Sequence, residues 1–238
     1  MKVVKQNSMN HNLEQFEERL GVTFANRDFL EQALVHRSYL NENPTFPFGH
    51  NERLEFLGDA VLELVVTEYL YKNYENPEGD LTNWRASLVN TKMLAEVAEE
   101  LHMRDYLYLS RGEAKETNPK ARTYILANTF EAVVGAMYLD QGFGAAEKFI
   151  HQFLLPRLPH ILEHELYRDP KSAFQEASQE KVGITPNYRV VSETGPDHAK
   201  IFTIGIYLND ELVAEGTGAS KQEGEEAAAR AALKAKSW

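Results

Sequence analysis

The sequence predicts an α+β protein of two domains, an all-helical first domain followed by a small α-β-β-β-α domain. Up to about Leu166, apolar residues recur every three or four positions and strand-like alternation is nearly absent, as in packed helices. After Asp169-Pro170 the pattern changes to three short runs rich in β-branched and aromatic residues, with a helical segment on either side. We expect the domains to span residues 13–163 and 170–238, joined by a linker of residues 164–169.

Turn-forming residues separate the helices predicted for the first domain. These helices span Glu14–Leu20, Asp28–Val35, Glu52–Asn73, Thr82–Leu101, Thr123–Asp140 and Ala145–Leu154. In the second domain, helices Ser172–Lys181 and Ser220–Lys236 are expected to flank the strands Asn187–Glu193, Lys200–Asn209 and Leu212–Gly216.

Composition narrows the class of protein. With 238 residues, 43% of them hydrophobic, the chain can bury a core, which argues against disorder. The absence of cysteine excludes disulfides, a thiol nucleophile and zinc ribbons, and makes a reducing cytoplasm the expected location. No stretch approaches the roughly 20 apolar residues of a membrane span, and Met1–Leu13 lacks the apolar core of a signal peptide. We therefore expect no membrane association.

The net charge of the chain bears on the partners it could bind. The net charge of −11 by itself argues against nucleic acid, because phosphate binding usually requires an excess of basic residues. The acidity is concentrated up to Asp169, where 26 acidic residues face 17 basic ones, against 10 and 8 in the remainder. Carboxylates in the first domain could instead hold metal cations.

One helix concentrates acidic side chains on one face. Glu52, Glu55 and Asp59 stand at positions i, i+3 and i+7, so they fall within one narrow stripe. The opposite side, expected to face the core, holds Leu54, Leu57, Val61 and Leu64. Such a stripe is either a solvated acidic face or a site for a hard divalent cation, which would relieve the repulsion between the carboxylates. Gly58 favours the second interpretation slightly, because a mid-helix glycine suggests that something approaches the backbone closely.

A second helix offers matching groups. Asn128 and Glu131 lie at i and i+3 in an otherwise apolar segment, and a carboxylate in such a segment is rarely buried without a partner. A metal shared with Glu55 and Asp59 would supply that partner. The alternative is an ion pair between Glu131 and an arginine such as Arg85 or Arg122.

The segment Asn51–Leu62 resembles, nearly letter for letter, the signature of ribonuclease III endonucleases. The resemblance continues in His36-Arg37-Ser38-Tyr39, Glu78-Gly79-Asp80-Leu81, Arg85–Val89 and Ile125–Asp140. The second domain is similar to the double-stranded RNA-binding domain that follows the nuclease domain in that family. The resemblance implies a homodimeric, Mg²⁺-dependent endoribonuclease, with Mn²⁺ as a possible substitute. Such an enzyme hydrolyses both strands of duplex RNA to 5′-phosphate and 3′-hydroxyl ends, in rRNA or mRNA processing.

The resemblance also implies residue roles. Glu55, Asp59, Asn128 and Glu131 would ligate the metal, with Asp59 and Glu131 catalytic and Glu52 a catalytic helper. Phe56 stands where the family places an aromatic side chain that inserts into the partner subunit, although ordinary helix packing would explain it equally well.

Asn128 departs from the aspartate usual in the family, which removes one negative charge from the site. Three outcomes are open: full activity, activity that needs more Mg²⁺ or prefers Mn²⁺, or an inactive homologue that only binds duplex RNA. We expect retained activity, because the other acidic residues of the signature are intact.

For the RNA-binding domain the resemblance implies three patches. They are Gln175 with Glu176, the loop Pro196-Asp197-His198, and Ser220 with Lys221, and each residue taken singly could be an ordinary surface residue. A lysine at a helix N-terminus favours phosphate independently of the family. Gln222 and Gly224 stand where lysine and alanine are usual, so we expect modest affinity from this domain alone.

Two further patterns in the sequence carry weaker signals. His160-Ile161-Leu162-Glu163-His164 matches the H-x-x-E-H pattern of zinc proteases, but no third zinc ligand is identifiable in the sequence. The chain contains no G-x-x-x-x-G-K loop, so no nucleotide cofactor is expected.

Overall fold

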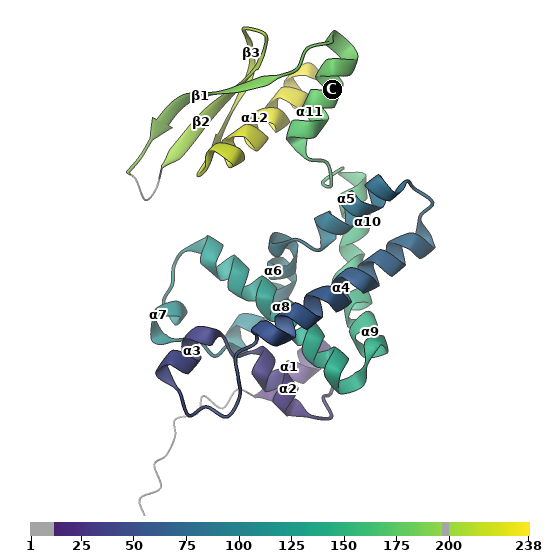
Figure 1. The fold of residues 1–238 in the computed structure, drawn as a ribbon, viewed down its shortest axis with the longest axis vertical. Helices are drawn as coiled ribbons and strands as arrows, with labels where there is room; N and C mark the ends of the chain where they lie inside the picture. The colour runs from purple at the N-terminus through teal and green to yellow at the C-terminus, as the bar shows by residue number, and fades with distance from the viewer. Residues whose placement is uncertain (1–11, 197–199) are drawn as a thin grey trace, which may run out of the picture. The chain divides into compact units, whose positions relative to one another are not determined.

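The computed structural model describes residues 12–196 and 200–238 (Figure 1). The chain divides into two compact units between His164 and Glu165. The predicted fold class is confirmed: a mostly helical unit is followed by three antiparallel strands flanked by helices.

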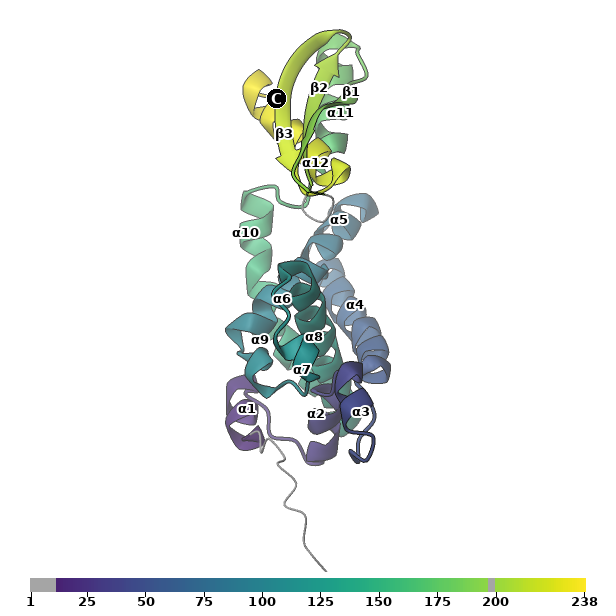
Figure 2. The same cartoon turned by 90° about the vertical axis from the view of Figure 1, so that its left-hand side faces the viewer.

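Two long helices, α4 (Glu52–Asn73) and α8 (Pro119–Gln141), lie side by side in the first unit (Figures 1 and 2). Helices α2 (Arg27–Ala33), α6 (Thr91–Glu100) and α9 (Phe143–Phe153) pack on α8, and α5 (Glu78–Leu88) packs on α4. The remaining helices are α1 (Leu13–Leu20), α3 (Arg37–Glu42), α7 (Arg111–Ala114), α10 (Leu158–Glu163), and the 3₁₀ helices η1 (Met103–Tyr106) and η2 (Leu155–Arg157). The largest fully buried side chains of the central pair include Leu62, Leu70 and Phe130.

The single helix predicted over Thr82–Leu101 is wrong, because α5 ends at Leu88 and α6 begins at Thr91. Asn90 makes the break. Its side-chain oxygen accepts the backbone N–H of Met93 at 2.9 Å, and its amide donates to the carbonyl of Ser87 at 2.7 Å. A side chain that caps one helix while binding the end of the previous one separates the two.

Helix α4 has the bounds that the sequence predicts, but its buried face differs from the expected one. Leu54 and Val61 are buried, whereas Leu64 is 56% exposed, so placing Leu64 in the core was wrong. Leu64 stands roughly 120° around the helix from Gly58, where α8 packs most closely, and therefore faces away from α8.

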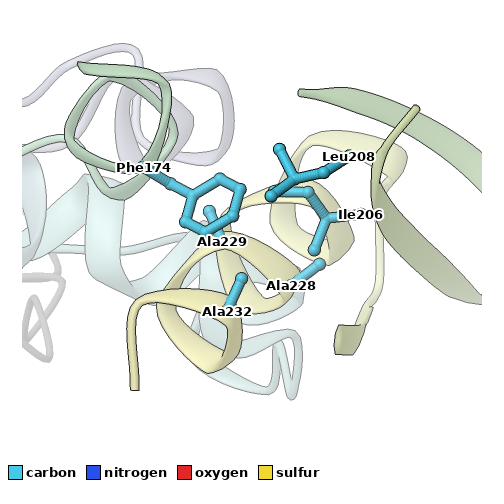
Figure 3. Packing of buried hydrophobic residues seen from close by; sticks show 6 residues of the cluster. All are labelled: Phe174, Ile206, Leu208, Ala228, Ala229 and Ala232. Carbon is cyan, nitrogen blue, oxygen red and sulfur yellow. The ribbon is translucent and has the colours of Figure 1, made fainter. Parts of the chain in front are cut away.

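The second unit is a three-stranded antiparallel sheet in the order β1 (Asn187–Thr194), β2 (Ile201–Leu208), β3 (Glu211–Gly218). Helices α11 (Pro170–Val182) and α12 (Lys221–Lys236) pack together, and α12 lies against β2 and β3 (Figure 1). The hydrophobic core of this second unit consists of Phe174, Ile206, Leu208, Ala228, Ala229 and Ala232 (Figure 3). A Cβ on Gly216 would lie only 2.1 Å from the backbone nitrogen of Ala228, so the alanine face of α12 packs directly on β3.

Candidate active site and RNA-binding surface

The candidate active site lies where the backbones of α4 and α8 touch. A Cβ on Gly58 would lie 1.8 Å from the carbonyl oxygen of Glu131, and a Cβ on Gly135 would lie 2.2 Å from that of Leu54. Only glycine fits at both positions. The close approach that Gly58 suggested is therefore real, but it comes from a second helix rather than from a ligand.

This crossing brings together residues that are far apart in the chain. Glu55 and Asp59 come from α4, three residues before Gly58 and directly after it, while Asn128 and Glu131 come from the facing part of α8. The side chain of Asn128 lies close enough to the carboxylate of Glu55 to lower its pKa as a hydrogen-bond donor. The four predicted metal ligands thus occupy one region of the domain.

The charges of neighbouring carboxylates contribute to raised pKa values at Glu131 and Glu55. Burial, and then the charges of Asp59 and Glu55, raise the pKa of Glu131 to about 8. Burial and the charge of Glu52 raise the pKa of Glu55, whereas the hydrogen bond from Asn128 lowers it. Repulsion between like charges and partial loss of solvent act together here, which is typical of a functional carboxylate cluster.

The proposed ion pairs of Glu131 do not form. Arg85 binds Glu63, with its Nε 2.8 Å from the carboxylate, and Arg122 donates from its Nε to the carbonyl of Glu116. No cation pairs with Glu131 among the residues that the structure describes. A half-buried carboxylate without a positive partner, beside two others and an amide, is a donor set that suits a hard cation.

Within residues 12–196 and 200–238, however, no three acidic or histidine side chains are gathered closely enough to hold a metal ion as they stand. The helices place the residues in one region, and the carboxylates would still have to converge on a cation. Mutual repulsion in the metal-free protein gives a physical reason for that separation.

Glu52 pairs with a cation, Arg37, and lies close to a histidine. Its carboxylate lies 3.3 Å from the guanidinium of Arg37 and 3.7 Å from Nδ1 of His50. The sequence motifs included Arg37, but neither this arginine nor His50 was predicted to contact the acidic stripe. His50 stands just before the carboxylate-rich helix α4, and a basic residue at that place is the signal that could have suggested a contact with Glu52.

Phe56 does not pack within its own chain. Its side chain is 81% exposed, which excludes the interpretation as ordinary helix packing. Leu64 and Tyr71 are exposed on the same helix. Near the end of α4, a cavity of about 660 Å³ is lined by residues that include Thr67, Tyr71, Tyr74, Leu81 and Arg85.

Among the predicted RNA-binding residues that the structure describes, Gln175, Glu176 and Lys221 are exposed and Ser220 is partly exposed. Gln175 and Glu176 are exposed on α11. Ser220 caps α12 by accepting the backbone N–H of Glu223 at 3.2 Å, and the exposed Lys221 opens that helix with its Nζ 5.8 Å from the centre of the Phe202 ring.

Gly224 stands where the family usually has alanine. A Cβ on Gly224 would lie 2.6 Å from a side-chain carbon of Ile204, so close packing explains this glycine. His198, predicted to contact RNA, lies outside the described residues.

Of the helices that the structure describes, none is both long and apolar enough to cross a membrane.

Comparisons with known proteins match both parts of the chain. A family model described as Ribonuclease-III-like matches residues 26–158, and one described as Double-stranded RNA binding motif matches residues 170–236. The protein named Ribonuclease 3 of Enterococcus faecalis is 43% identical over 222 residues, which cover 92% of this chain and 95% of that protein. The protein of the same name from Pelotomaculum thermopropionicum is 44% identical over 218 residues, which cover 91% of this chain and 90% of that protein.

A solved structure is also similar. The nuclease domain of ribonuclease III from Campylobacter jejuni shares 39% identity with a TM-score of 0.55, over 62% of this chain and 99% of that domain. That structure is described as showing flexibility in a region involved in dimer formation.

Proposed function

The chain belongs to the ribonuclease III family, and we propose that Glu55, Asp59, Asn128 and Glu131 form the metal site at which it cleaves RNA. It is an endoribonuclease of double-stranded RNA, with a nuclease domain followed by a double-stranded RNA-binding domain. As a member of this family it uses a divalent metal ion. The observation that supports the proposed site most strongly is the glycine-mediated contact that faces the two ligand-bearing helices toward each other.

We propose Mg²⁺ as the natural ion and Mn²⁺ as a substitute, because all the candidate ligand atoms are oxygens. A bound ion would activate a water molecule and stabilise the charge on the leaving oxygen, giving 5′-phosphate and 3′-hydroxyl ends. Glu55 and Asp59 would hold it from α4, and Asn128 and Glu131 from α8. Since the amide of Asn128 can donate an N–H to Glu55, its oxygen is left to act as a ligand.

Asn128 also supports a second candidate, a homologue that binds duplex RNA with weak or no cleavage. We favour retained cleavage that requires more Mg²⁺ than an aspartate at this position would. The hydrogen bond between Asn128 and Glu55 joins the amide to the cluster, and the three carboxylates are intact. Glu52, held by Arg37 and His50, would assist from outside the metal site.

We further propose that the chain acts as a homodimer through the exposed face of α4. A two-fold interface is self-complementary, so a projecting side chain on one copy needs a recess on the other. Phe56 projects near the start of α4, and the 660 Å³ cavity lies near its end, about 22 Å away along the helix for a separation of 15 residues. Two copies with antiparallel α4 helices would seat each Phe56 in the cavity of the partner.

Duplex RNA is recognised mainly by shape, through 2′-hydroxyls and phosphates. We assign this contact to Gln175 and Glu176 on α11 and to Ser220 and Lys221 at the start of α12. The cytoplasmic location and the role in rRNA or mRNA processing stay predictions.

The site is tested with labelled duplex RNA incubated with and without Mg²⁺. We expect cleavage by the wild-type protein only with Mg²⁺. Glu131→Gln should abolish cleavage and leave duplex binding close to normal, because the RNA-binding domain is unchanged. Glu68→Gln is the matched control, since Glu68 is on α4 but pairs with Lys72 at 2.6 Å. Normal cleavage by Glu131→Gln would refute the assignment of the metal ligands.

A further inference from the structure

Helix α10 presents two histidines on one face, outside the site described above. His160 and His164 are one helical turn apart, and their ring centres lie 4.2 Å apart with an angle of 47° between the planes. Both residues are exposed. Two imidazoles held this close at i and i+4 can reach a common ion from one side of a helix.

A hydrogen bond to the backbone favours one tautomer of His164. Its Nδ1 lies 3.1 Å from the carbonyl oxygen of His160. A carbonyl oxygen only accepts, so this contact requires a proton on Nδ1, and in the neutral ring the Nε2 lone pair is then the one that can bind a metal. Metal-binding histidines typically donate their second ring N–H to a carbonyl or carboxylate in this way, which orients the ring.

We propose that His160 and His164 together bind a borderline divalent cation such as Cu²⁺, Ni²⁺ or Zn²⁺ through their ring nitrogens. Imidazole suits these ions, whereas Mg²⁺ prefers oxygen ligands. The site is therefore chemically distinct from the carboxylates of α4 and α8. Among divalent ions the affinity should follow the usual order for nitrogen ligands, with Cu²⁺ bound more tightly than Ni²⁺ or Zn²⁺.

The coordination sphere is completed by water. In the part of the chain that the structure describes, no third histidine, aspartate or glutamate joins the pair in a metal-binding group. A catalytic zinc site usually has three protein ligands, so the H-x-x-E-H pattern does not make a protease of this chain. The two histidines instead form a site in which the remaining coordination positions of the ion are open to solvent.

Metal binding at this place has a local structural effect. Helix α10 has six residues, and His164 is the residue at its C-terminal cap. An ion that binds His160 and His164 together bridges the last turn, so it binds the helical form in preference to the frayed one and stabilises it by mass action. The end of the nuclease unit at His164 is then held in its helical conformation.

The test measures Ni²⁺ binding to the untagged full-length protein by titration calorimetry, in the presence of excess Mg²⁺. We expect the wild-type protein to bind Ni²⁺, and the double variant His160→Gln/His164→Gln to lose about tenfold or more in affinity. The matched control is His102→Asn/His151→Gln, which removes the same number of exposed histidines. In the structure His102 lies 3.7 Å from Asp105, and His151 packs edge-on against Tyr69.

The proposal is overturned if the wild-type protein does not bind Ni²⁺, or if the double variant binds as tightly as wild type. Equal loss in the control variant would also overturn it. Glu131→Gln should bind Ni²⁺ like the wild-type protein, and excess Mg²⁺ should not displace the ion. Loss of Ni²⁺ binding in Glu131→Gln, or displacement by Mg²⁺, would place the bound ion at the carboxylates instead. Circular dichroism spectra of all variants establish that they are folded.

Discussion

Replacing Gly58 with alanine should damage stability and cleavage together. The added Cβ would lie 1.8 Å from the carbonyl oxygen of Glu131, whereas ordinary contacts begin near 3.4 Å. The two helices would have to separate by roughly 1.6 Å at this point, and no side-chain rotation can relieve the contact because it is with backbone. That movement carries Glu131 away from Glu55 and Asp59.

The size of the effect follows from two opposing contributions. Overpacking of a core costs about 1–3 kcal/mol and occasionally more, and a backbone clash belongs at the upper end. Alanine gains about 1 kcal/mol over glycine in helix propensity. We therefore expect Gly58→Ala to lose about 2 kcal/mol or more of unfolding free energy, a fall of roughly 4–8 °C in Tm.

Gly79→Ala provides the matched control. Gly79 is in the first turn of α5, and nothing lies within 4 Å of the position its Cβ would take. This variant should be as stable as wild type or gain up to about 1 kcal/mol. Both variants are compared by thermal unfolding and by cleavage of duplex RNA across a range of Mg²⁺ concentrations. If Gly58→Ala unfolds and cleaves like Gly79→Ala, the close contact between α4 and α8 does not hold the site together.

Four further outcomes follow from the structure. Because Glu131 has a pKa of about 8 when folded, against an ordinary 4.5, the folded state holds its proton more strongly. The metal-free protein should therefore lose about 1–2 kcal/mol between about pH 5 and pH 8, a value reduced for solvent access, and Glu131→Gln should flatten that dependence in urea unfolding curves. Phe56→Asp should shift the protein from dimer to monomer in analytical ultracentrifugation, and an unchanged sedimentation coefficient would contradict the interface. Lys221→Gln should weaken duplex binding and reduce the slope of log affinity against log salt by about one, measured by fluorescence anisotropy; an unchanged slope would remove Lys221 from the phosphate contacts. Asn128→Asp should lower the Mg²⁺ concentration needed for half-maximal cleavage, whereas an equal or higher requirement would show that the amide does not weaken metal binding.

Much of the fold could be predicted because local patterns are strong. The bounds of α4 follow from a long apolar repeat that ends before Asn76-Pro77, and the three strands follow from their β-branched runs. The break at Asn90 was missed because apolar periodicity continues across it, although an asparagine before threonine is itself a helix-start signal. Helices such as α3 and α7, six and four residues long, are too short to show a period.

The candidate site was predictable only in part. Spacing places Glu55 and Asp59 on one helix face, but nothing local in the sequence says that Glu131 faces them. That depends on the contact between Gly58 and Gly135, which is a property of the tertiary packing. The exposure of Phe56 was undecided for the same reason, because an aromatic residue on a helix has the same pattern whether it faces its own core or another copy.

The meeting of α4 and α8 at two glycines has an evolutionary consequence. Main-chain atoms, rather than interlocking side chains, set the gap across which the acidic groups face each other. An amino-acid exchange at a proposed ligand position such as Asn128 can therefore alter the charge of the proposed site while its dimensions stay constant. In such a scaffold, single substitutions can change the metal concentration that the site requires while the fold of the domain stays the same.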